Sequence, residues 1–205
     1  MPVLAEEFEV VPRLEQLGLT KAELFDVVRA AVGARRNATP FHPLSAGGLL
    51  GWIAGTAHLR RIFTARGWDI CRRDNIEAIF NSETGIKIIY QNADRAGDPL
   101  FDPVASSKKG AGAARAVELG QYELFPEVRE REVVEITAPT WCLFVYADGP
   151  DVRAELSCPQ AINGEQFDGF HERILLIQKG EWDSPDALAD DTPSIDFEVS
   201  VTRKN

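Results

Sequence analysis

The sequence predicts an α+β protein with about three helices, mainly in the N-terminal half, and about seven mostly antiparallel strands in one or two sheets. Three observations support this fold class. Apolar side chains recur at helical spacing in residues 20–35 and 45–67. Residues 76–92 and 140–159 each consist of two apolar runs joined by a glycine-containing turn, which is typical of a β-hairpin. Residues 195–201 alternate strictly between apolar and polar side chains, as a strand with one wet face does.

The first helices are expected before residue 36. A helical turn is predicted over residues 11–17, followed by a longer helix that begins at Thr20 and ends near Arg35. Thr20 and Glu23 have the spacing of a capping box, in which each residue accepts a hydrogen bond from the other's backbone N–H. The apolar stripe of this helix consists of Leu24, Val27, Val28, Ala31 and Val32.

The next helix is predicted to begin after Ser45 and to end at Gly67. Its buried face is expected to hold Leu49, Trp52, Ile53, Thr56, Leu59 and Phe63. Gly47, Gly51 and Gly55 recur every fourth residue, although each glycine inside a helix costs about 1 kcal/mol relative to alanine. Either a neighbouring element packs closely against this glycine groove, or a ligand approaches it, with Ser45 and the helix N-terminus holding an anion.

The first hairpin is predicted to turn through residues 83–85, which would pair Asn81 with Lys87 and Phe80 with Ile88. One face would then be core and carry Ile76, Ala78, Phe80, Ile86, Ile88 and Tyr90. The other face would carry Glu77, Asn81, Lys87 and Gln91 around Ile79 and Ile89. That half-polar face is either plain exposed sheet or the floor of a shallow polar site.

A turn at residues 148–151 predicts the register of the second hairpin. Its core face would pair Trp141, Leu143, Val145 and Ala147 with Cys158, Leu156, Ala154 and Val152. On the opposite face, Tyr146 would lie beside Arg153. These two side chains suit either a cross-strand cation–π pair or stacking on nucleic-acid bases.

The remaining segments are a long loop over 93–107, a helix of small residues from about 111 to 122, a turn at Asn163-Gly164 and a strand over 172–178. An acidic loop is predicted over 181–193. The acidic stretch 118–135 could join a helix-rich part, residues 1–122, to an acidic, strand-rich part, residues 123–205. One continuous domain is the alternative.

Composition excludes several classes of protein. Of the 205 residues, 44% are hydrophobic and 26% are charged, which is ordinary for a globular chain and unlike a disordered one. No apolar run approaches the roughly 20 residues of a membrane span, so we expect no membrane partner. The first twelve residues are acidic where a signal peptide is basic, which indicates a cytoplasmic location. Three cysteines without CxxC spacing favour neither a disulfide framework nor a zinc site.

Charge is distributed unevenly along the chain, whose net charge is −10. Residues 29–109 contain 12 Lys and Arg against 7 Asp and Glu, a balance of +5. Residues 117–205 contain 7 against 19, a balance of −12. One interpretation of this asymmetry is a solvated acidic surface. The other is a basic face that binds a polyanion, together with an acidic half that stays away from the polyanion or binds a basic partner.

The first functional hypothesis is therefore a non-enzymatic protein that binds the phosphates of DNA or RNA. Its candidate residues are the cations of the central helix, the strand after it and the following loop: Arg60, Arg61, Arg66, Arg72, Arg73, Lys108 and Lys109. No P-loop, GxGxxG or nucleophile-elbow motif is present, so we predict no catalytic residue, cofactor or bound metal.

Two alternatives come from other classes. One is a protein interaction module or inhibitor that presents its acidic C-terminal half, including residues 183–191, to a basic partner. The other is a metal-dependent hydrolase or nuclease that uses Glu77, with Lys87 on the same face of the first hairpin. The oligomeric state is not predicted.

Overall fold

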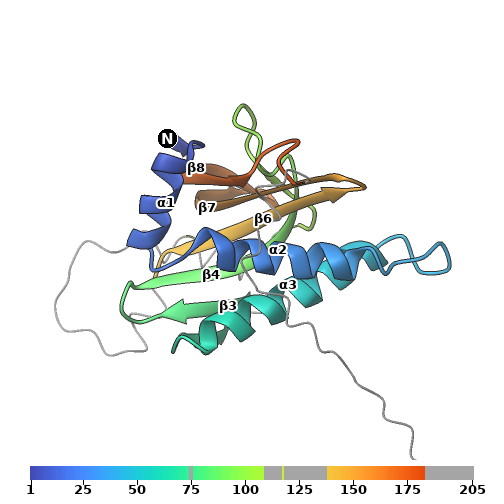
Figure 1. The fold of residues 1–205 in the computed structure, drawn as a ribbon, viewed down its shortest axis with the longest axis horizontal. Coiled ribbons are helices and arrows are strands. Elements are labelled where there is room, and N and C mark those ends of the chain that lie inside the picture. The colour runs from blue at the N-terminus through green and yellow to red at the C-terminus, as the bar shows by residue number, and fades with distance from the viewer. Residues whose placement is uncertain (74–75, 109–116, 118–137, 183–205) are drawn as a thin grey trace, which may run out of the picture.

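The computed structural model of the protein describes residues 1–73, 76–108, 117 and 138–182, and it confirms the α+β class. Three helices pack with one mixed sheet in these residues (Figure 1). The helices are α1 (Glu7–Gln16), α2 (Lys21–Arg35) and α3 (Ala46–Thr64). The strands are β1 (Val3–Leu4), β2 (Asp69–Arg73), β3 (Ile76–Asn81), β4 (Ile86–Asp94), β5 (Val104–Ala105), β6 (Thr140–Asp148), β7 (Asp151–Asn163) and β8 (Gln166–Ile177).

The sheet has the strand order β1-β8-β7-β6-β4-β3-β2, and β5 pairs with β4 outside this path. The pairs β4–β6 and β1–β8 are parallel, whereas the other described strand pairs are antiparallel, as predicted for most of the sheet. Strands from both parts of the sequence therefore belong to one sheet, joined where β6 lies beside β4.

The first two helices begin at capping boxes. The α2 helix follows the predicted box, in which Thr20 accepts a hydrogen bond from the Glu23 backbone, and it ends at Arg35 as predicted. The α1 helix is longer than the predicted turn over 11–17, because Glu6 and Glu9 form a second capping box ahead of it. Satisfying the free N–H groups there lets the helix begin five residues before Pro12.

The α3 helix begins after Ser45, but the Ser45 side chain makes no capping hydrogen bond. The predicted burial is right for Thr56, Leu59 and Phe63 and wrong for Leu49 and Ile53, which are exposed. A Cβ atom at Gly55 would lie 2.5 Å from the Tyr90 ring. The glycine side of α3 thus packs against its neighbours, which turns Leu49 and Ile53 outward and confirms the close-packing interpretation of Gly55.

The register of the first hairpin differs from the prediction by one residue. Asn81 pairs with Ile86 and Ile79 pairs with Ile88, so the connection has four residues rather than three. The Asn81 side-chain oxygen accepts hydrogen bonds from the backbone N–H groups of Glu83 and Thr84, which stabilises the longer turn. Because side chains alternate along a strand, this shift moves half of each predicted face to the other side.

Ile79, Ile86, Ile88 and Tyr90 consequently share the face that packs against the helices. Ala78 and Phe80 lie on the opposite face. The predicted sharing of one face by Glu77 and Lys87 is therefore wrong, since Lys87 pairs with Phe80.

The second hairpin has the predicted register. Leu143 pairs with Leu156, and Tyr146 pairs with Arg153. The uniform apolar face and the tight turn both specify this alignment. The turn at Asn163-Gly164 is also confirmed, because β7 and β8 pair on either side of it with Gly164 at a φ of 64°.

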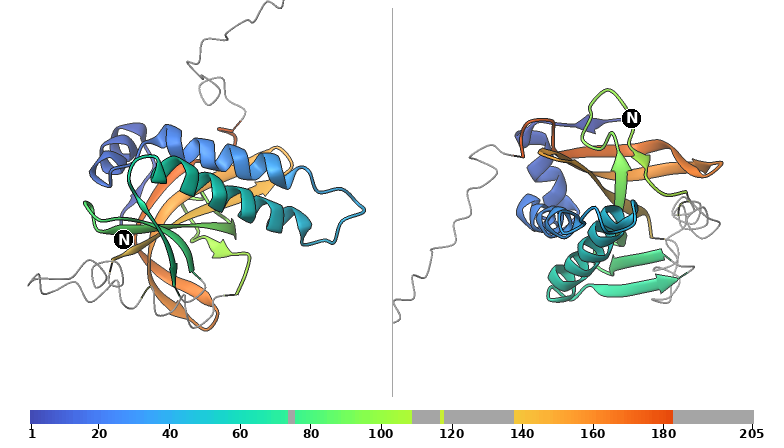
Figure 2. Two further views of the ribbon diagram at one scale, coloured as in Figure 1. Left: turned by 90° about the horizontal axis from the view of Figure 1, so that it is seen from below. Right: turned by 90° about the vertical axis from the view of Figure 1, so that its right-hand side faces the viewer.

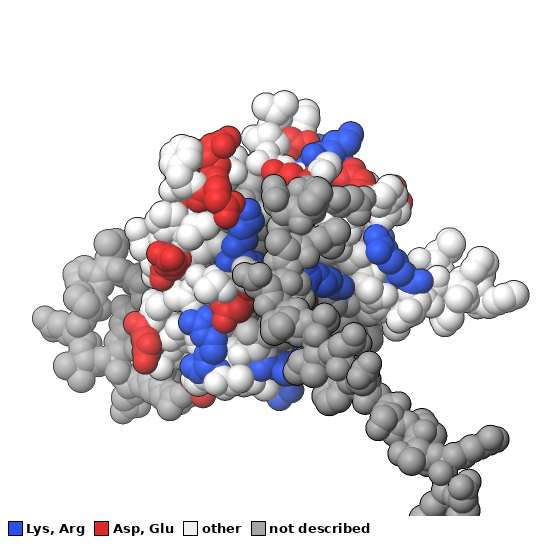
Figure 3. All heavy atoms as spheres, viewed as in Figure 1, with Lys and Arg blue, Asp and Glu red and all other residues white. Residues whose placement is uncertain are grey.

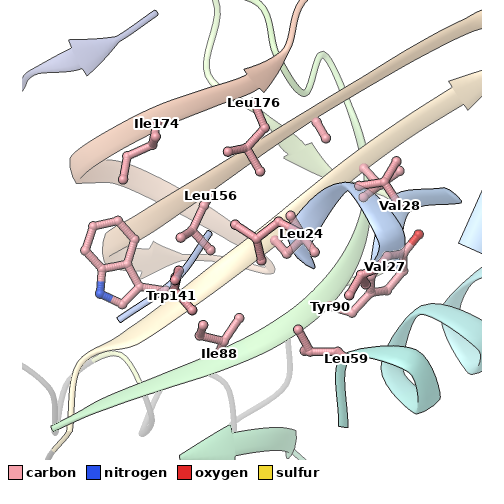
Figure 4. Packing of buried hydrophobic residues seen from close by; sticks show 14 of the residues in the cluster. Leu24, Val27, Val28, Leu59, Ile88, Tyr90, Trp141, Leu156, Ile174 and Leu176 are labelled. Atoms are coloured by element: carbon pink, nitrogen blue, oxygen red, sulfur yellow. The ribbon is translucent and has the colours of Figure 1, made fainter. Parts of the chain in front are cut away.

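The α2 and α3 helices lie side by side across one face of the sheet (Figure 2). Between them and the sheet lies the main hydrophobic core, which draws side chains from α2, α3, β4, β6, β7 and β8 (Figure 4). Leu24 and Val27 of α2 thus face the strand residues Ile88 and Leu156 within one cluster. This packing leaves the outer sides of α2 and α3 as a broad part of the protein surface.

Several predicted segments lie outside the described residues: the acidic stretch 118–135, most of the helix 111–122, the acidic loop beyond Trp182 and the strand 195–201. None of the helices that the structure describes combines the length and apolar character needed to cross a bilayer. Cys71, Cys142 and Cys158 are buried free thiols. Burial raises the pKa of the Cys158 thiol to about 12, so this group stays protonated near neutral pH.

Candidate functional site

Glu77 joins two of the candidate arginines at the edge of the sheet. Arg72 lies opposite Glu77 in the β2–β3 ladder, and its Nε atom is 3.4 Å from Oε2 of Glu77. Arg60 reaches the same oxygen from α3 and donates a hydrogen bond to it through Nη2. Arg60 is largely buried, whereas 64% of the Arg72 side chain is exposed. One carboxylate thus balances two guanidinium groups and leaves a net charge of about +1 in this cluster.

Arg66 follows the end of α3 and forms an ion pair with the first turn of α2. Its Nη1 atom lies 2.8 Å from both carboxylate oxygens of Glu23, and its guanidinium lies over the Phe63 ring. The pair connects the end of one helix to the start of the next. This geometry explains Arg66 as a packing residue and neutralises its charge.

Arg61 is the exposed cation at the end of α3. Its Nη2 atom lies 3.0 Å from Nδ1 of His58, one turn earlier. Burial, and then the charge of Arg61, lowers the pKa of His58, so the ring is neutral at pH 7 and can accept a hydrogen bond. Within the described part of the chain, no carboxylate forms an ion pair with Arg61. Its charge remains available to a ligand.

The remaining candidates do not join this group in the described structure. Lys108 forms an ion pair with Glu165 in the turn between β7 and β8, and β6, β4 and β3 separate these strands from β2. The backbone of Arg73 pairs with Ile76, but its side chain lies outside the described residues, as does Lys109. The structure therefore gathers Arg60, Arg61 and Arg72 near one end of α3 and places Lys108 elsewhere.

Ion pairs also connect the basic and acidic parts of the sequence. Lys108 of the basic part contacts Glu165 of the acidic part. In the reverse sense, Asp102 of the basic part contacts Arg173 of the acidic part. On the face seen in Figure 3, basic and acidic side chains are interspersed over the described surface. Part of the charge asymmetry is therefore internal to the fold.

Glu77 has surroundings unlike those of a metal ligand, because two guanidinium groups approach the same carboxylate oxygen. Lys87 lies on the other face of the sheet. Among the described residues there is no group of three or more His, Cys, Asp or Glu side chains arranged to hold a metal ion.

Tyr146 and Arg153 form the cation–π pair that was one interpretation of the second hairpin. The Arg153 guanidinium lies 5.2 Å from the centre of the Tyr146 ring. Its Nε atom also donates a hydrogen bond to Asp151, 2.9 Å away. This hydrogen bond lowers the pKa of the Asp151 carboxyl group. The guanidinium thus occupies one side of the tyrosine ring, where a base would otherwise stack.

The outward side of α3 carries a feature that the sequence analysis missed. Leu49, Ile53, Ala57 and Arg61 follow one another at intervals of four residues, all exposed, and we call them the outer row of α3. Leu49 is 55% exposed and Ile53 is 50% exposed. Two further large apolar side chains, Phe41 and Leu44, are fully exposed in the loop that leads into the helix.

The i, i+4 spacing from Leu49 to Arg61 was visible in the sequence. Periodicity alone places Leu49 and Ile53 of this row on the buried face, because the helix has apolar residues on two sides and the pattern does not show which side faces the sheet. Comparisons of the chain with protein-family models, with curated proteins and with solved structures find no match.

Proposed function

We propose that this protein is a non-enzymatic interaction module that binds an acidic amphipathic segment of a partner protein along the outer row of α3. The observation that carries the proposal is the half-exposed state of Leu49 and Ile53, one turn apart on a helix whose other side packs in the core. A helix on the surface of a globular protein normally turns its large apolar side chains inward. Contiguous patches of exposed apolar side chains mark interaction surfaces.

The charge at the end of the row indicates the chemistry of the partner. Arg61 extends the row beyond Ala57, and the Arg60–Glu77–Arg72 cluster beside the end of α3 adds further positive charge. An apolar stripe that ends in cations complements a helix with apolar residues at i and i+4 followed by carboxylates. A polyanion alone would leave Leu49 and Ile53 exposed to water.

Two matched helical peptides test this proposal against the whole chain. Both carry leucine at i and i+4, one with glutamates and the other with lysines on the remaining surface, and binding is read by fluorescence anisotropy. The acidic peptide should bind, and Leu49→Asp should weaken its binding by about tenfold or more. Equal binding of the two peptides to the wild-type protein contradicts the proposal. Binding of the acidic peptide to the Leu49→Asp variant with unchanged affinity also contradicts it.

A second copy of this chain is another possible occupant of the row, and the same variant identifies it. If the wild-type protein is a dimer by light scattering and the Leu49→Asp variant is a monomer, then the row is a self-association surface. In that case a second copy of the chain, rather than an acidic partner protein, would occupy the outer row of α3.

Nucleic-acid binding is the second candidate, and the exposure of Arg61 and Arg72 favours it. Its support is reduced because Glu23 and Glu77 already pair with Arg66 and Arg60. If phosphates bind here, affinity for labelled DNA or RNA falls steeply with rising salt. A flat salt dependence contradicts this candidate.

The other expectations stay predictions. The acidic surface proposed for residues 183–191 lies outside the described residues, and the geometry around Glu77 gives the hydrolase alternative no support. A cytoplasmic location remains the expectation from the sequence.

A further inference from the structure

The two central parallel strands separate at their carboxyl ends. β4 and β6 are paired from Lys87 and Thr140 as far as Asn92 and Val145. Beyond that point β4 pairs with β5, while β6 continues beside β7 to Asp148. In sheets with parallel strands, ligands commonly bind beyond the carboxyl ends, where neighbouring strands diverge. The divergence of β4 and β6 creates such a place.

A polar pocket of about 250 Å³ occupies this divergence. Its polar lining comes from the last turn of α2, the ends of β4 and β6 and the residue after β5: Arg35, Asn92, Asp94, Ser106, Tyr146 and Asp148. This volume is below the roughly 300–1,000 Å³ of pockets for drug-sized molecules, so the ligand has to be small.

The pocket contains charges of both signs that do not neutralise each other. Within the described residues, Arg35 forms no ion pair with a carboxylate, and Asp94 and Asp148 form none with a cation. The side-chain stem of Arg35 packs on the first turns of α3. A Cβ atom at Gly51 would lie 3.6 Å from Cβ of Arg35. The stem is thereby positioned by packing, whereas no carboxylate of the described residues forms an ion pair with the guanidinium.

Asn92 gives this pocket a fixed wall. Its Nδ2 atom donates to the Gly48 carbonyl, 2.7 Å away, and its Oδ1 atom accepts from the Tyr90 hydroxyl, 3.2 Å away. The Ser106 backbone N–H also donates to the Asn92 carbonyl. These bonds connect α3, β4 and the residue after β5, so the pocket is formed by elements that are anchored to one another.

We infer that this pocket binds a small zwitterion with one carboxylate and one ammonium group, of the class of the free α-amino acids. Arg35 donates two parallel hydrogen bonds to the ligand carboxylate, which suits the planar guanidinium. Asp94 and Asp148 accept hydrogen bonds from the ammonium group. A plain anion would leave the carboxylates without a partner, and a plain cation would leave Arg35 without one. This inference is independent of the proposed docking on α3.

The test uses ¹⁵N-labelled full-length protein and each of the common free α-amino acids, with binding followed by the amide resonances of Ala93, Asp94 and Ala147. At least one amino acid should shift these resonances at millimolar concentration. Its N-acetyl derivative lacks the ammonium group and its methyl ester lacks the carboxylate, so both should bind about tenfold more weakly or worse.

Variants assign the two halves of the site. Arg35→Gln should remove the preference for the free acid over the ester, and Asp148→Asn should reduce the preference for the free amine over the N-acetyl form. Arg36→Gln and Glu83→Gln are matched controls, because these exposed residues do not line the pocket. Asp148 lies at an exposed turn, so its substitution keeps the test valid if Arg35→Gln impairs folding.

Any one of three results would overturn the inference. One is the absence of any resonance shift with every free amino acid. A second is equal binding of the free, acetylated and esterified forms. A third is binding that Arg35→Gln and Asp148→Asn leave unchanged.

Discussion

The ring of Tyr90 fills the space where a side chain at Gly55 would begin, since a Cβ atom there would lie 2.5 Å from Cε2 of Tyr90. Tyr90 is 3% exposed, and its hydroxyl donates to Asn92. Burial raises the pKa of this hydroxyl, so it remains a donor throughout the neutral range. The contact holds α3 close to β4 and thereby sets which side of α3 faces solvent.

Gly55→Ala should therefore destabilise the protein, although alanine is the better helix former. Overpacking of this kind typically costs about 1–3 kcal/mol, more than the roughly 1 kcal/mol gained in helix propensity. Gly33→Ala is the control, because a Cβ atom at Gly33 in α2 meets nothing within 4 Å, and that variant should be stabilised. Urea denaturation compares the two, and a stabilised Gly55→Ala variant would contradict the close packing.

The face of the sheet that points away from α2 and α3 contains a buried ion pair. Arg173 and Glu155 are 1% and 0% exposed, and the Arg173 Nη2 atom lies 2.6 Å from Glu155 Oε2. Arg173→Met should cost about 3–5 kcal/mol, because it leaves a buried carboxylate without its cation. Adding Glu155→Gln should recover about 1 kcal/mol or more of that loss. Equal free energies of unfolding for the single and double variants would show that the charge of Glu155 is not the cause.

His58 should titrate below its ordinary pKa of 6.5, chiefly because it is partly buried and further because Arg61 lies beside it. Since the unfolded chain binds the proton more readily, the contribution of His58 to stability is present above pH 6.5 and is lost as the pH falls below it. NMR titration should show the pKa rising in Arg61→Gln. Arg72→Gln removes an equal charge elsewhere and should leave it unchanged; equal shifts in both variants would contradict the local contact.

If the second functional candidate is right, charge reversal of either Arg61 or Arg72 should lower affinity for labelled DNA or RNA and make the salt dependence less steep. Lys179→Glu alters the net charge in the same way outside the candidate set and should have less effect. The readout is fluorescence anisotropy over a range of salt concentrations. An equal loss in the control variant would indicate only a long-range effect of net charge.

Local signals in the sequence predicted much of the fold. The Thr20 and Glu23 capping box fixed the start of α2, and the apolar faces with a tight turn fixed the second hairpin. The first hairpin shifted by one residue because the Asn81 side chain bonds to the turn, which spacing alone does not reveal. The exposed side of α3 was misassigned because periodicity cannot choose between two apolar sides of one helix.

The candidate site was less predictable for a physical reason. Clustering of arginines in the sequence says nothing about carboxylates that fold against them from distant segments. Glu23 is 43 residues from Arg66, and Glu77 is 17 residues from Arg60. The pocket at Arg35 likewise depends on four separate segments that meet at the ends of β4 and β6.

The most direct test of the proposed docking on α3 is the map of amide shifts that the acidic amphipathic peptide produces in ¹⁵N-labelled protein. The proposal predicts that the largest shifts fall on residues 49–61 and that Leu49→Asp abolishes them while Lys179→Glu does not. Shifts elsewhere in the protein, or shifts on α3 that Leu49→Asp leaves intact, would contradict it.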